Sequence, residues 1–542
     1  MAQQPKINQS WLGGTYTLQG NSLASRECIN AYLQSGEGEA KYSELIIGTP
    51  GTEALVELAD EGLDLNSACR GFWLSGASPH EGGNLYWVFG STLGYTYLDE
   101  FGVLQSVQLY NIGSGTNRVS ITDNGFNVVV ATGTQMLVVD IFTGGNGKYV
   151  ADRVYDITSD LPFTNPIQVV YLKGRVYSIA SPTVGGTNSL DSAVKSNVIW
   201  YSELPGDDGG AKVWDGLSFV GADLSSDPVT AITVRQGDIW AHGPRSYQIF
   251  ITTNDADAPL QYSPGSGTTI GTNAPETVAS IGSDIFWLGS NSAGRNKVFM
   301  GVSYNSKRIS THAIESSLDK LNELTNGAYA FSYVESGHTF YVLSIPPGKY
   351  TFEGREEYSY GLTYAYDTLT GVWHRRTSRN PKTGVLEAWH PKYAVFAWGK
   401  IITGNSLWAT IMELRNDVYV EYDPTTDTGS KPITRIYQGP IFFSNMQEFI
   451  LDEFVWDIIT GHGPSTGNSS EPVADIFISY DGGNVFEHAG TETLAKTGNY
   501  GKQVRFNGLG AGRAIVVRIV ITEDMQFQAG QARLRTRVSR KS

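Results

Sequence analysis

A local pattern that recurs from about residue 80 to residue 435 is the strongest constraint on the fold of this chain. Each instance joins a turn containing Gly or Asp to an aromatic-rich strand, a second turn and a second strand. The turn glycines are spaced by roughly 40 to 65 residues, the length of one four-stranded propeller blade with or without a loop insertion. One small sheet cannot bury its faces alone, whereas blades stacked around an axis cover one another. The instances are residues 83–89, 124–130, 173–178, 236–241, 282–288, 336–342 and, more weakly, 397–402.

We expect an all-β protein with a multi-bladed β-propeller of six or seven blades over residues 71–435. A β-sandwich with similar strand spacing is the alternative. The composition, with 62 glycines, 12% aromatic and 17% charged residues, is typical of short strands joined by tight turns. One short amphipathic helix is expected near residues 314–324, where Ile314, Leu318 and Leu321 share a face.

Both ends of the chain lack the blade pattern. Residues 1–70 form a leading segment, and residues 436–542 predict a small antiparallel β-module. That module has an alternating strand at 474–480, a turn at 481–484 and a β-branched strand at 514–522. We expect the two end segments to pack together into one β-rich platform beside the propeller.

The chain has few of the signals that accompany export or nucleic-acid binding. Its two cysteines, Cys28 and Cys69, predict a fold that matures without disulfides. The first residues contain no apolar stretch typical of a signal peptide, and no apolar run reaches the ~20 residues of a membrane helix. The net charge of -15 disfavours general nucleic-acid binding. We therefore expect a protein without a membrane span, made in a cytoplasm.

The sequence carries almost no pattern typical of a catalytic site. The sequence has no HExxH, paired CxxC, GxSxG or Walker pattern, so we expect no catalytic, metal or cofactor site. Residues 479–486 match the Asp-box of sialidase-type propellers, in which the Asp accepts backbone N–H bonds across a hairpin turn. The box occurs once and outside the repeat region, and glycoside hydrolysis also needs two paired carboxylates. We interpret Asp481 and Gly483 as turn residues.

Three stretches together resemble one known family. Residues 25–33 and 45–51 are similar to the opening of the tail hub proteins of short-tailed bacteriophages, also called packaged-DNA stabilisation proteins. Residues 366–376 resemble that family's Tyr-Asp-x-x-Thr-Gly-x-Trp hairpin, and residues 478–483 with 509–519 resemble its closing module. The residues that carry the resemblance are Arg26, Asn30, Tyr32, Gly48, Pro50, Gly51, Asp367, Gly371, Trp373, Asp481 and Gly483.

The resemblance implies a structural virion protein and not an enzyme. It implies a homo-oligomeric ring, usually of six copies, that forms the nozzle at the distal end of the tail. The ring would attach to the head–tail adaptor, retain and guide duplex DNA, and dock tail fibres, a tailspike or a needle. Assembly would take place in the host cytoplasm. Two other interpretations are a glycan-binding or glycan-hydrolysing propeller that serves as a receptor-binding tail component, and a general propeller scaffold.

A basic strip at the end of the chain is the candidate assembly contact. Strand alternation places Arg533, Arg535 and Arg537 on one face, and Arg540 and Lys541 follow them. The strip either contacts a neighbouring subunit, the adaptor or DNA, or is a solvated terminus. If it is a contact, deleting residues 531–542 should weaken assembly on the adaptor in a salt-sensitive way and leave the fold of the monomer intact.

The remaining motif residues have simpler expected roles. Arg26 and Asn30 either anchor the leading segment to residues 436–542 or cap a local turn. The segment from Gly48 to Gly51 predicts a Pro-Gly turn. Asp367 and Trp373 are expected to be hairpin turn and packing residues.

Overall fold

Short antiparallel strands make up most of the computed structural model, which confirms that the chain is mostly β. The structure describes residues 10–18, 24–36, 41–143, 148–181, 196–204, 210–223, 225, 227–291, 294–444, 447–464 and 468–538. Within these ranges the helices are α1 (His312–Lys320) and the short 3-10 helices η1 (Thr158–Asp160), η2 (Pro275–Thr277), η3 (Thr325–Gly327) and η4 (Asn468–Ser470).

Consecutive four-stranded sheets follow one another along the middle of the chain, as the recurring pattern predicts. In each sheet every strand pairs antiparallel with the next one in sequence, and tight turns join many of these neighbours. The first five sheets are β6 (Cys69–Ser75), β7 (Asn84–Phe89), β8 (Thr92–Leu98), β9 (Leu104–Asn111); β10 (Ser120–Asp123), β11 (Asn127–Ala131), β12 (Met136–Thr143), β13 (Lys148–Asp156); β14 (Pro166–Leu172), β15 (Arg175–Ala180), β16 (Val198–Tyr201), β17 (Phe219–Gly221); β18 (Ala231–Arg235), β19 (Asp238–His242), β20 (Tyr247–Thr252), β21 (Leu260–Tyr262); and β22 (Ala279–Ile281), β23 (Asp284–Asn291), β24 (Gly294–Val302), β25 (Asn305–Arg308).

Two further four-stranded units complete the series, and each includes a strand that pairs with the N-terminal segment. The first consists of β26 (Tyr329–Glu335), β27 (His338–Ile345), β30 (Leu362–Asp367) and β31 (Val372–Arg379); β31 continues into the platform. The second consists of β33 (Pro391–Ala397), β34 (Lys400–Asn405), β35 (Thr410–Arg415) and β5 (Gly51–Glu57). The hairpins β28 (Gly348–Phe352) with β29 (Arg355–Ser359) and β36 (Val420–Tyr422) with β37 (Ser430–Pro432) are additions to these units, as is β32 (Leu386–Ala388), which pairs with β31.

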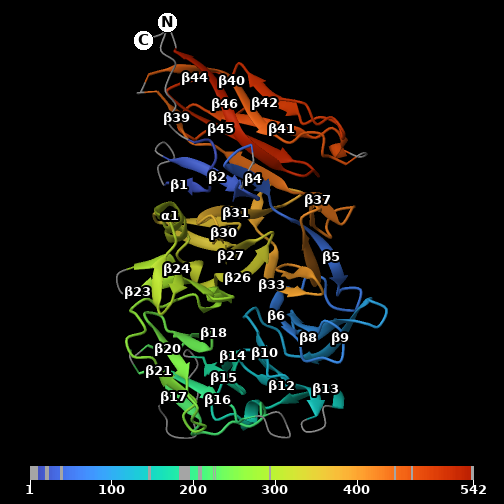
Figure 1. The fold of residues 1–542 in the computed structure, drawn as a ribbon, viewed down its shortest axis with the longest axis vertical. Coiled ribbons are helices and arrows are strands. Elements are labelled where there is room, and N and C mark those ends of the chain that lie inside the picture. Colours follow the sequence, from blue (N-terminus) through green and yellow to red (C-terminus); the bar gives the residue numbers. More distant parts are fainter. Residues whose placement is uncertain are drawn as a thin grey trace.

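The sheets surround a common centre (Figure 1). The first strands of the seven described units contact one another in chain order, and β33 also contacts β6, which closes the circle. Apolar side chains fill the spaces between neighbouring sheets: Trp240 of β19, for example, packs against Trp287 of β23 with ring centroids 6.2 Å apart. This arrangement is a β-propeller and not the alternative sandwich.

Strand β5 lies in the propeller, although residues 1–70 were expected to belong to the platform. It pairs along its length with β35, with Gly51 opposite Arg415. A strand from the start of the chain thus completes a sheet whose other strands come some 350 residues later. No local pattern reveals such a pairing, because the partner strand is remote in sequence.

The two end segments lie together at one end of the molecule (Figure 1). One sheet continues from β31 through β2 (Ser25–Ile29), β38 (Thr434–Gln438), β45 (Ala514–Thr522), β41 (Val473–Ser479) and β42 (Glu487–Thr493). The facing sheet has the order β3 (Ala31–Ser35), β4 (Glu44–Gly48), β46 (Gln528–Val538), β40 (Phe449–Ile458) and β43 (Val504–Asn507). The short strands β1 (Tyr16–Thr17), β39 (Phe442–Phe443) and β44 (Ala511–Gly512) extend these two sheets.

A shared core joins the two platform sheets. Trp11 from the start of the described chain packs among Tyr437, Phe454 and Trp456, with ring centroids 5.0–5.7 Å apart. Cys28 belongs to the same core, and both it and Cys69 are free and buried. Because residues from both ends fill one core, the platform is a single packed unit.

Candidate functional site: the platform–propeller junction and the arginine strip

Asn30 is the centre of the junction between platform and propeller. It lies between β2 and β3 with φ of 53°, a left-handed conformation that Asn tolerates better than most residues. Its amide Nδ2 donates to the carbonyl oxygen and to Oγ1 of Thr377 on β31, at 2.9 and 3.1 Å, and to the carbonyl oxygen of Thr434, at 2.9 Å. Its Oδ1 accepts from the N–H of Thr377 at 2.9 Å. One buried side chain therefore links the leading segment, the propeller and the first strand of the C-terminal module.

The neighbouring motif residues Arg26 and Tyr32 make contacts on opposite sides of this junction. Arg26 donates from its guanidinium to the carbonyl oxygen of Ser10 at 2.5 Å, so its hydrogen-bond contact is with the leading segment itself. Tyr32 faces the propeller, with its ring 5.1 Å from His338 and 5.2 Å from Phe340. Burial, helped by the nearby charge of Glu335, raises the pKa of Tyr32.

The segment from Gly48 to Gly51 does not form the expected Pro-Gly turn. It connects β4 in the platform to β5 in the propeller. A Cβ atom on Gly51 would lie 2.4 Å from the carbonyl oxygen of Val420, and one on Gly48 would lie 2.8 Å from Nε of Arg435. The glycines are needed for close approach and not for a positive φ. Pro50 lies in the same crossing between them.

The hairpin between β30 and β31 has the expected turn chemistry. Oδ1 of Asp367 accepts from the N–H of Leu369 at 3.0 Å, and Oδ2 accepts from Oγ1 of Thr370 at 2.7 Å. Gly371 has φ of 69°, which favours glycine. Trp373 is buried and donates from Nε1 to the carbonyl oxygen of Ile309 at 2.9 Å. These residues build the hairpin and point to no ligand.

The turn after β41 has the Asp-box geometry. Oδ1 of Asp481 accepts from the N–H groups of Asn484 and Val485 at 3.0 and 3.1 Å. Ser479 also donates to Oδ1, and these bonds hold the pKa of Asp481 below its usual value. Gly483 has φ of 102°, and a Cβ atom there would lie 2.6 Å from Oγ of Ser25 on β2. The turn thus packs against the leading segment, and its carboxylate is occupied by its own backbone.

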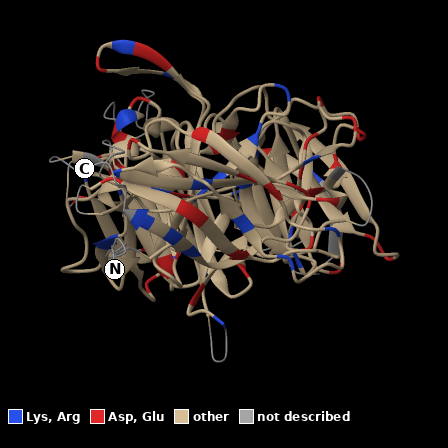
Figure 2. Cartoon of the chain, turned by 90° about the horizontal axis from the view of Figure 1, so that it is seen from above, with Lys and Arg blue, Asp and Glu red and all other residues tan. Residues whose placement is uncertain are grey.

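The arginine strip is Arg533, Arg535 and Arg537 on β46. All three side chains are exposed, and they alternate with partly buried neighbours that face the platform core. Arg533 pairs with Glu453 at 2.9 Å, and Arg537 pairs with Asp452 at 3.0 Å, both on the adjacent strand β40. Arg540 and Lys541 lie outside the described residues. Seen from the platform end, acidic and basic residues are interspersed on this part of the molecule (Figure 2).

The strip is not a dispensable terminus. Strand β46 lies between β4 and β40 and pairs with both. Removing residues 531–542 would take away the part of β46 that pairs with β40 and leave only its short pairing with β4 at Gln528 and Ala529, which argues against the expectation that such a truncation spares the fold. Sequence reasoning missed this because the partner strands lie about 80 and almost 500 residues away.

Comparison with known proteins identifies the propeller. The sequence matches the family described as "Bacteriophage P22 Gp10, beta-propeller" over residues 59–419. The chain belongs to this family. A search of curated proteins finds no match. Similar solved structures include a streptogramin B lyase (10% identity, 68% of this chain and 98% of that one, TM-score 0.37), the WD40 β-propeller domain of Doa1 (10%, 67% and 96%, 0.34) and a putative 6-phosphogluconolactonase from Bacteroides uniformis (12%, 65% and 100%, 0.29).

The Gp10-family match confirms the resemblance inferred from the motifs. It contains the hairpin with Asp367, Gly371 and Trp373 but ends before β38 and begins after β5. The description of the platform therefore rests on the structure and not on the family match.

A buried polar cluster in this Gp10-family propeller escaped sequence reasoning. Nδ1 of His338 is 2.8 Å from Oδ2 of Asp367, and Nε of Arg376 is 3.3 Å from Nε2 of His374. Arg376 also lies 4.0 Å from the buried carboxylate of Glu335. Burial, with the charge of Arg376 adding to it, holds the pKa of His374 well below its ordinary value. The residues come from four strands, β26, β27, β30 and β31, and lack any shared spacing, so no sequence signal could have found them.

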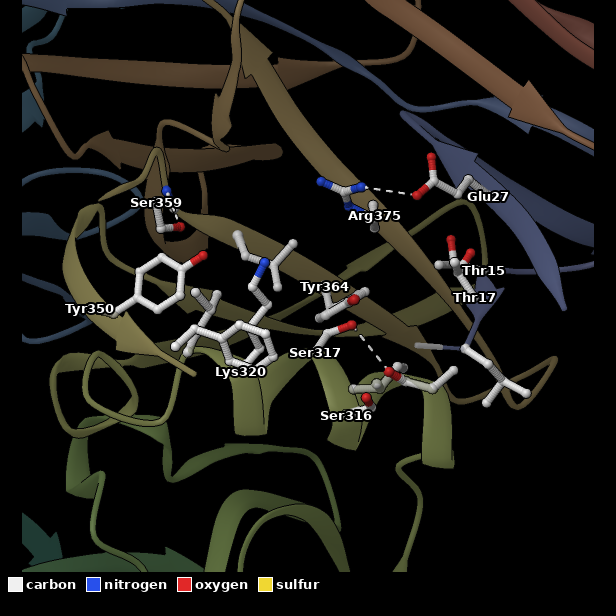
Figure 3. Close-up of a pocket in the computed structure, with 17 residues that line it drawn as sticks. Thr15, Thr17, Glu27, Ser316, Ser317, Lys320, Tyr350, Ser359, Tyr364 and Arg375 are labelled. Carbon is white, nitrogen blue, oxygen red and sulfur yellow. Dashed lines mark hydrogen bonds and ion pairs between the residues drawn. The ribbon is translucent and has the colours of Figure 1, made fainter. Parts of the chain in front are cut away.

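One cavity lies where α1, the hairpin β28–β29 and the strands β1 and β2 meet (Figure 3). Its volume is about 530 Å³, and its walls carry hydroxyl groups, aromatic rings and Lys320. The one carboxylate in the lining, Glu27, pairs with Arg375 at 3.4 Å. A pair of carboxylates suited to glycoside hydrolysis is therefore missing from this lining.

In the described part of the chain no group of three His, Cys, Asp or Glu side chains could hold a metal ion. No described helix combines the length and the apolar character needed to cross a bilayer.

Proposed function

We propose that this protein is a structural virion component that forms the distal nozzle ring of a short phage tail. The observation that supports this most is the Gp10-family match over residues 59–419, which include most of the propeller. The proposed role needs no active site, and the motif carboxylates Asp367 and Asp481 are bound by their own turns.

The proposed organisation is a propeller of seven blades with a platform beside it. The seven four-stranded units and the contact of β33 with β6 support this count. In this proposal residues 1–70 and 436–542 form the platform and residues 71–435 form the propeller. The exception is β5, which lies within residues 1–70 but belongs to the propeller.

The proposed assembly is a closed ring of six copies with interfaces mainly on the platform. Head-to-tail contacts close into rings when the rotation between copies fits. The arginine strip lies on the exposed face of the platform sheet, which supports it as a contact for an acidic neighbour or the head–tail adaptor. Tail fibres, a tailspike or a needle would dock on the same ring, in the virion tail. The net charge of -15 is compatible with a channel that releases duplex DNA easily, since each phosphate contact would slow release.

Native mass spectrometry of the purified chain, alone and mixed with its adaptor, tests this proposal. We expect a closed ring of six copies in at least the mixture. A chain that stays monomeric in both samples would contradict the nozzle role.

A parallel incubation with host lipopolysaccharide, capsule and sialosides tests the glycan alternative. We expect no cleavage. Cleavage that disappears when a single carboxylate is replaced would favour the receptor-binding enzyme instead.

A further inference from the structure

The cavity where the propeller meets the platform is built largely by parts that are additions to the blade repeat. Its walls come from the leading segment, from α1, from the hairpin β28–β29 and from the strands β30 and β31. The hairpin pairs with no other described strand, and a two-stranded sheet is only marginally stable by itself. Tyr350 and Phe352 on its inner face line the cavity. The helix and the hairpin thus enclose a space that the four-stranded unit alone would not form.

The cavity has the size and the position of a small-molecule site. Its volume of about 530 Å³ lies within the roughly 300–1,000 Å³ that is typical of such sites, which favour the boundary between two packed units. Figure 3 shows Tyr350 and Lys320 on one side, Glu27 and Arg375 on the other, and Tyr364 between them. A ligand that fills this space would contact groups from both sides.

Glu27 and Arg375 place a hydrogen-bond acceptor beside several donors. Oε1 of Glu27 accepts from Nη1 of Arg375 at 3.4 Å. Among the described residues, neither side chain forms another hydrogen bond. Both side chains are partly exposed, at 21% for Glu27 and 22% for Arg375. Oε2 of the carboxylate and Nη2 of the guanidinium therefore remain for a ligand.

Lys320 of α1 forms a second charge pair on the other side of the cavity. Its Nζ lies 3.3 Å from Oε2 of Glu357, which also accepts from the hydroxyl of Tyr350. The same Nζ lies 5.0 Å from the ring centroid of Phe352. An ammonium has three donors, and the Lys320 side chain is 43% exposed, so it too can bond a ligand. Each cation of the lining has a carboxylate partner, so the cavity favours neither anions nor cations.

Hydroxyl groups and aromatic rings complete the lining. The hydroxyls belong to Thr15, Thr17, Ser316, Ser317, Ser359, Tyr350 and Tyr364, and the last two also supply rings, as does Phe352. Several hydroxyls donate to backbone carbonyls, as Thr17 does to Arg26 at 3.1 Å, and this leaves lone pairs on their oxygens. The lining therefore suits an uncharged ligand that donates and accepts at several atoms and has apolar faces for the rings.

We propose that this cavity binds a neutral sugar. Neighbouring hydroxyl groups of the sugar would donate to Oε2 of Glu27 and accept from Nη2 of Arg375 and Nζ of Lys320. Its C–H face would lie against the aromatic side chains. An anion would be repelled by Glu27, and a cation by Lys320 and Arg375. With one carboxylate in the lining, the site would hold the sugar without cleaving it. The site does not depend on the nozzle role.

Saturation-transfer difference NMR of the full chain tests the site. The separate probes are D-glucose, D-galactose, D-mannose, L-rhamnose and N-acetyl-D-glucosamine, with acetate and choline as charged comparison probes. We expect at least one sugar to bind saturably and more tightly than either charged probe. Tighter binding of acetate or choline than of every sugar would overturn the assignment to a neutral ligand. The absence of saturable binding by all five sugars would overturn the site.

A space-filling variant locates the binding. Ser316→Phe adds a ring to the lining and should abolish saturable binding of the best sugar. His312→Phe is its control, because His312 lies on the same helix, is 79% exposed and does not line the cavity. This control should bind as the unaltered chain does, and thermal unfolding of both variants checks that they are folded.

A second pair of variants tests the carboxylate. Glu27→Gln should weaken the best sugar about tenfold or more, because a charge-assisted hydrogen bond becomes a neutral one. Glu356→Gln, at an exposed position of the hairpin β28–β29, should leave the affinity unchanged. If Ser316→Phe and Glu27→Gln both bind the sugar as the unaltered chain does, the assignment to this cavity is wrong.

Discussion

Asn30 and Thr377 bind each other through three hydrogen bonds across 347 residues of sequence. The bonds join a residue of the leading segment to the outer strand of a propeller sheet. The third donor contact of Asn30, to Thr434, reaches the strand that starts the C-terminal module. The junction between platform and propeller therefore depends on one amide side chain in a left-handed backbone position.

Asn30→Ala should destabilise the protein by about 3 kcal/mol. It removes a buried hydrogen-bond network and places Ala in a left-handed conformation. Asn165→Ala is the control, because Asn165 has nearly the same φ of 54°. This substitution should lower the free energy of unfolding by only ~1 kcal/mol, the cost of Ala in a left-handed conformation. Urea denaturation of both variants measures the difference. Equal losses of unfolding free energy would show that the hydrogen bonds of Asn30 contribute nothing.

Gly51→Ala should destabilise the chain by about 2 kcal/mol. The new Cβ would lie within 2.5 Å of two backbone oxygens, those of Val418 and Val420, which cannot move aside as a flexible side chain could. Gly76→Ala is the matched control, since nothing lies within 4 Å of a Cβ there. Thermal unfolding should give a lower midpoint for Gly51→Ala and an almost unchanged one for Gly76→Ala. A stable Gly51→Ala protein would argue against the crossing of β4 into β5.

His242→Phe should reduce the acid sensitivity of the fold. His242 lies fully buried among the rings of Trp240, Tyr247 and Trp287, and burial lowers its pKa to about 3. The unfolded chain, with a histidine pKa of about 6.5, binds this proton first. Stability contributed by the neutral ring is therefore complete above about pH 6.5 and is lost as the pH falls from there toward 3.

Unfolding free energies at pH 7.5 and pH 5 test this prediction. The linkage predicts that the unaltered chain loses about 2 kcal/mol more between these values than His242→Phe does. His462→Phe, which replaces an exposed histidine, should leave the loss unchanged. If His242→Phe and the unaltered chain respond alike to acid, His242 is not the proton acceptor.

The triple change Arg533→Gln, Arg535→Gln and Arg537→Gln should weaken ring assembly without unfolding the subunit. These side chains are exposed and their ion pairs to β40 are screened by solvent, so they contribute little to the fold. Analytical ultracentrifugation with and without the adaptor, at low and high salt, measures assembly. The unaltered chain should lose assembly as salt rises, and the variant should be weaker at low salt and less sensitive to it. Normal, salt-sensitive assembly of the variant would place the interface elsewhere.

Much of the fold is predictable because its signals are local. The turn-and-strand repeat sets most sheets, since each strand pairs with its sequence neighbour. The amphipathic segment becomes α1, with Ile314 and Leu318 buried as their spacing predicts. The Asp-box turn at Asp481 is likewise complete within a few residues.

Tertiary structure alone decides what depends on remote pairing. The sequence by itself determined a mostly β chain of repeated hairpins, a hairpin turn at Asp367 and alternation of the arginine strip. Only the folded chain showed that β5 completes a late sheet, that Arg533 meets Glu453, and that Glu27 and Arg375 line one cavity with Lys320. The physical reason is that turns and alternation are properties of a few neighbouring residues, whereas register, ion pairing and cavity lining depend on which distant strands pack together.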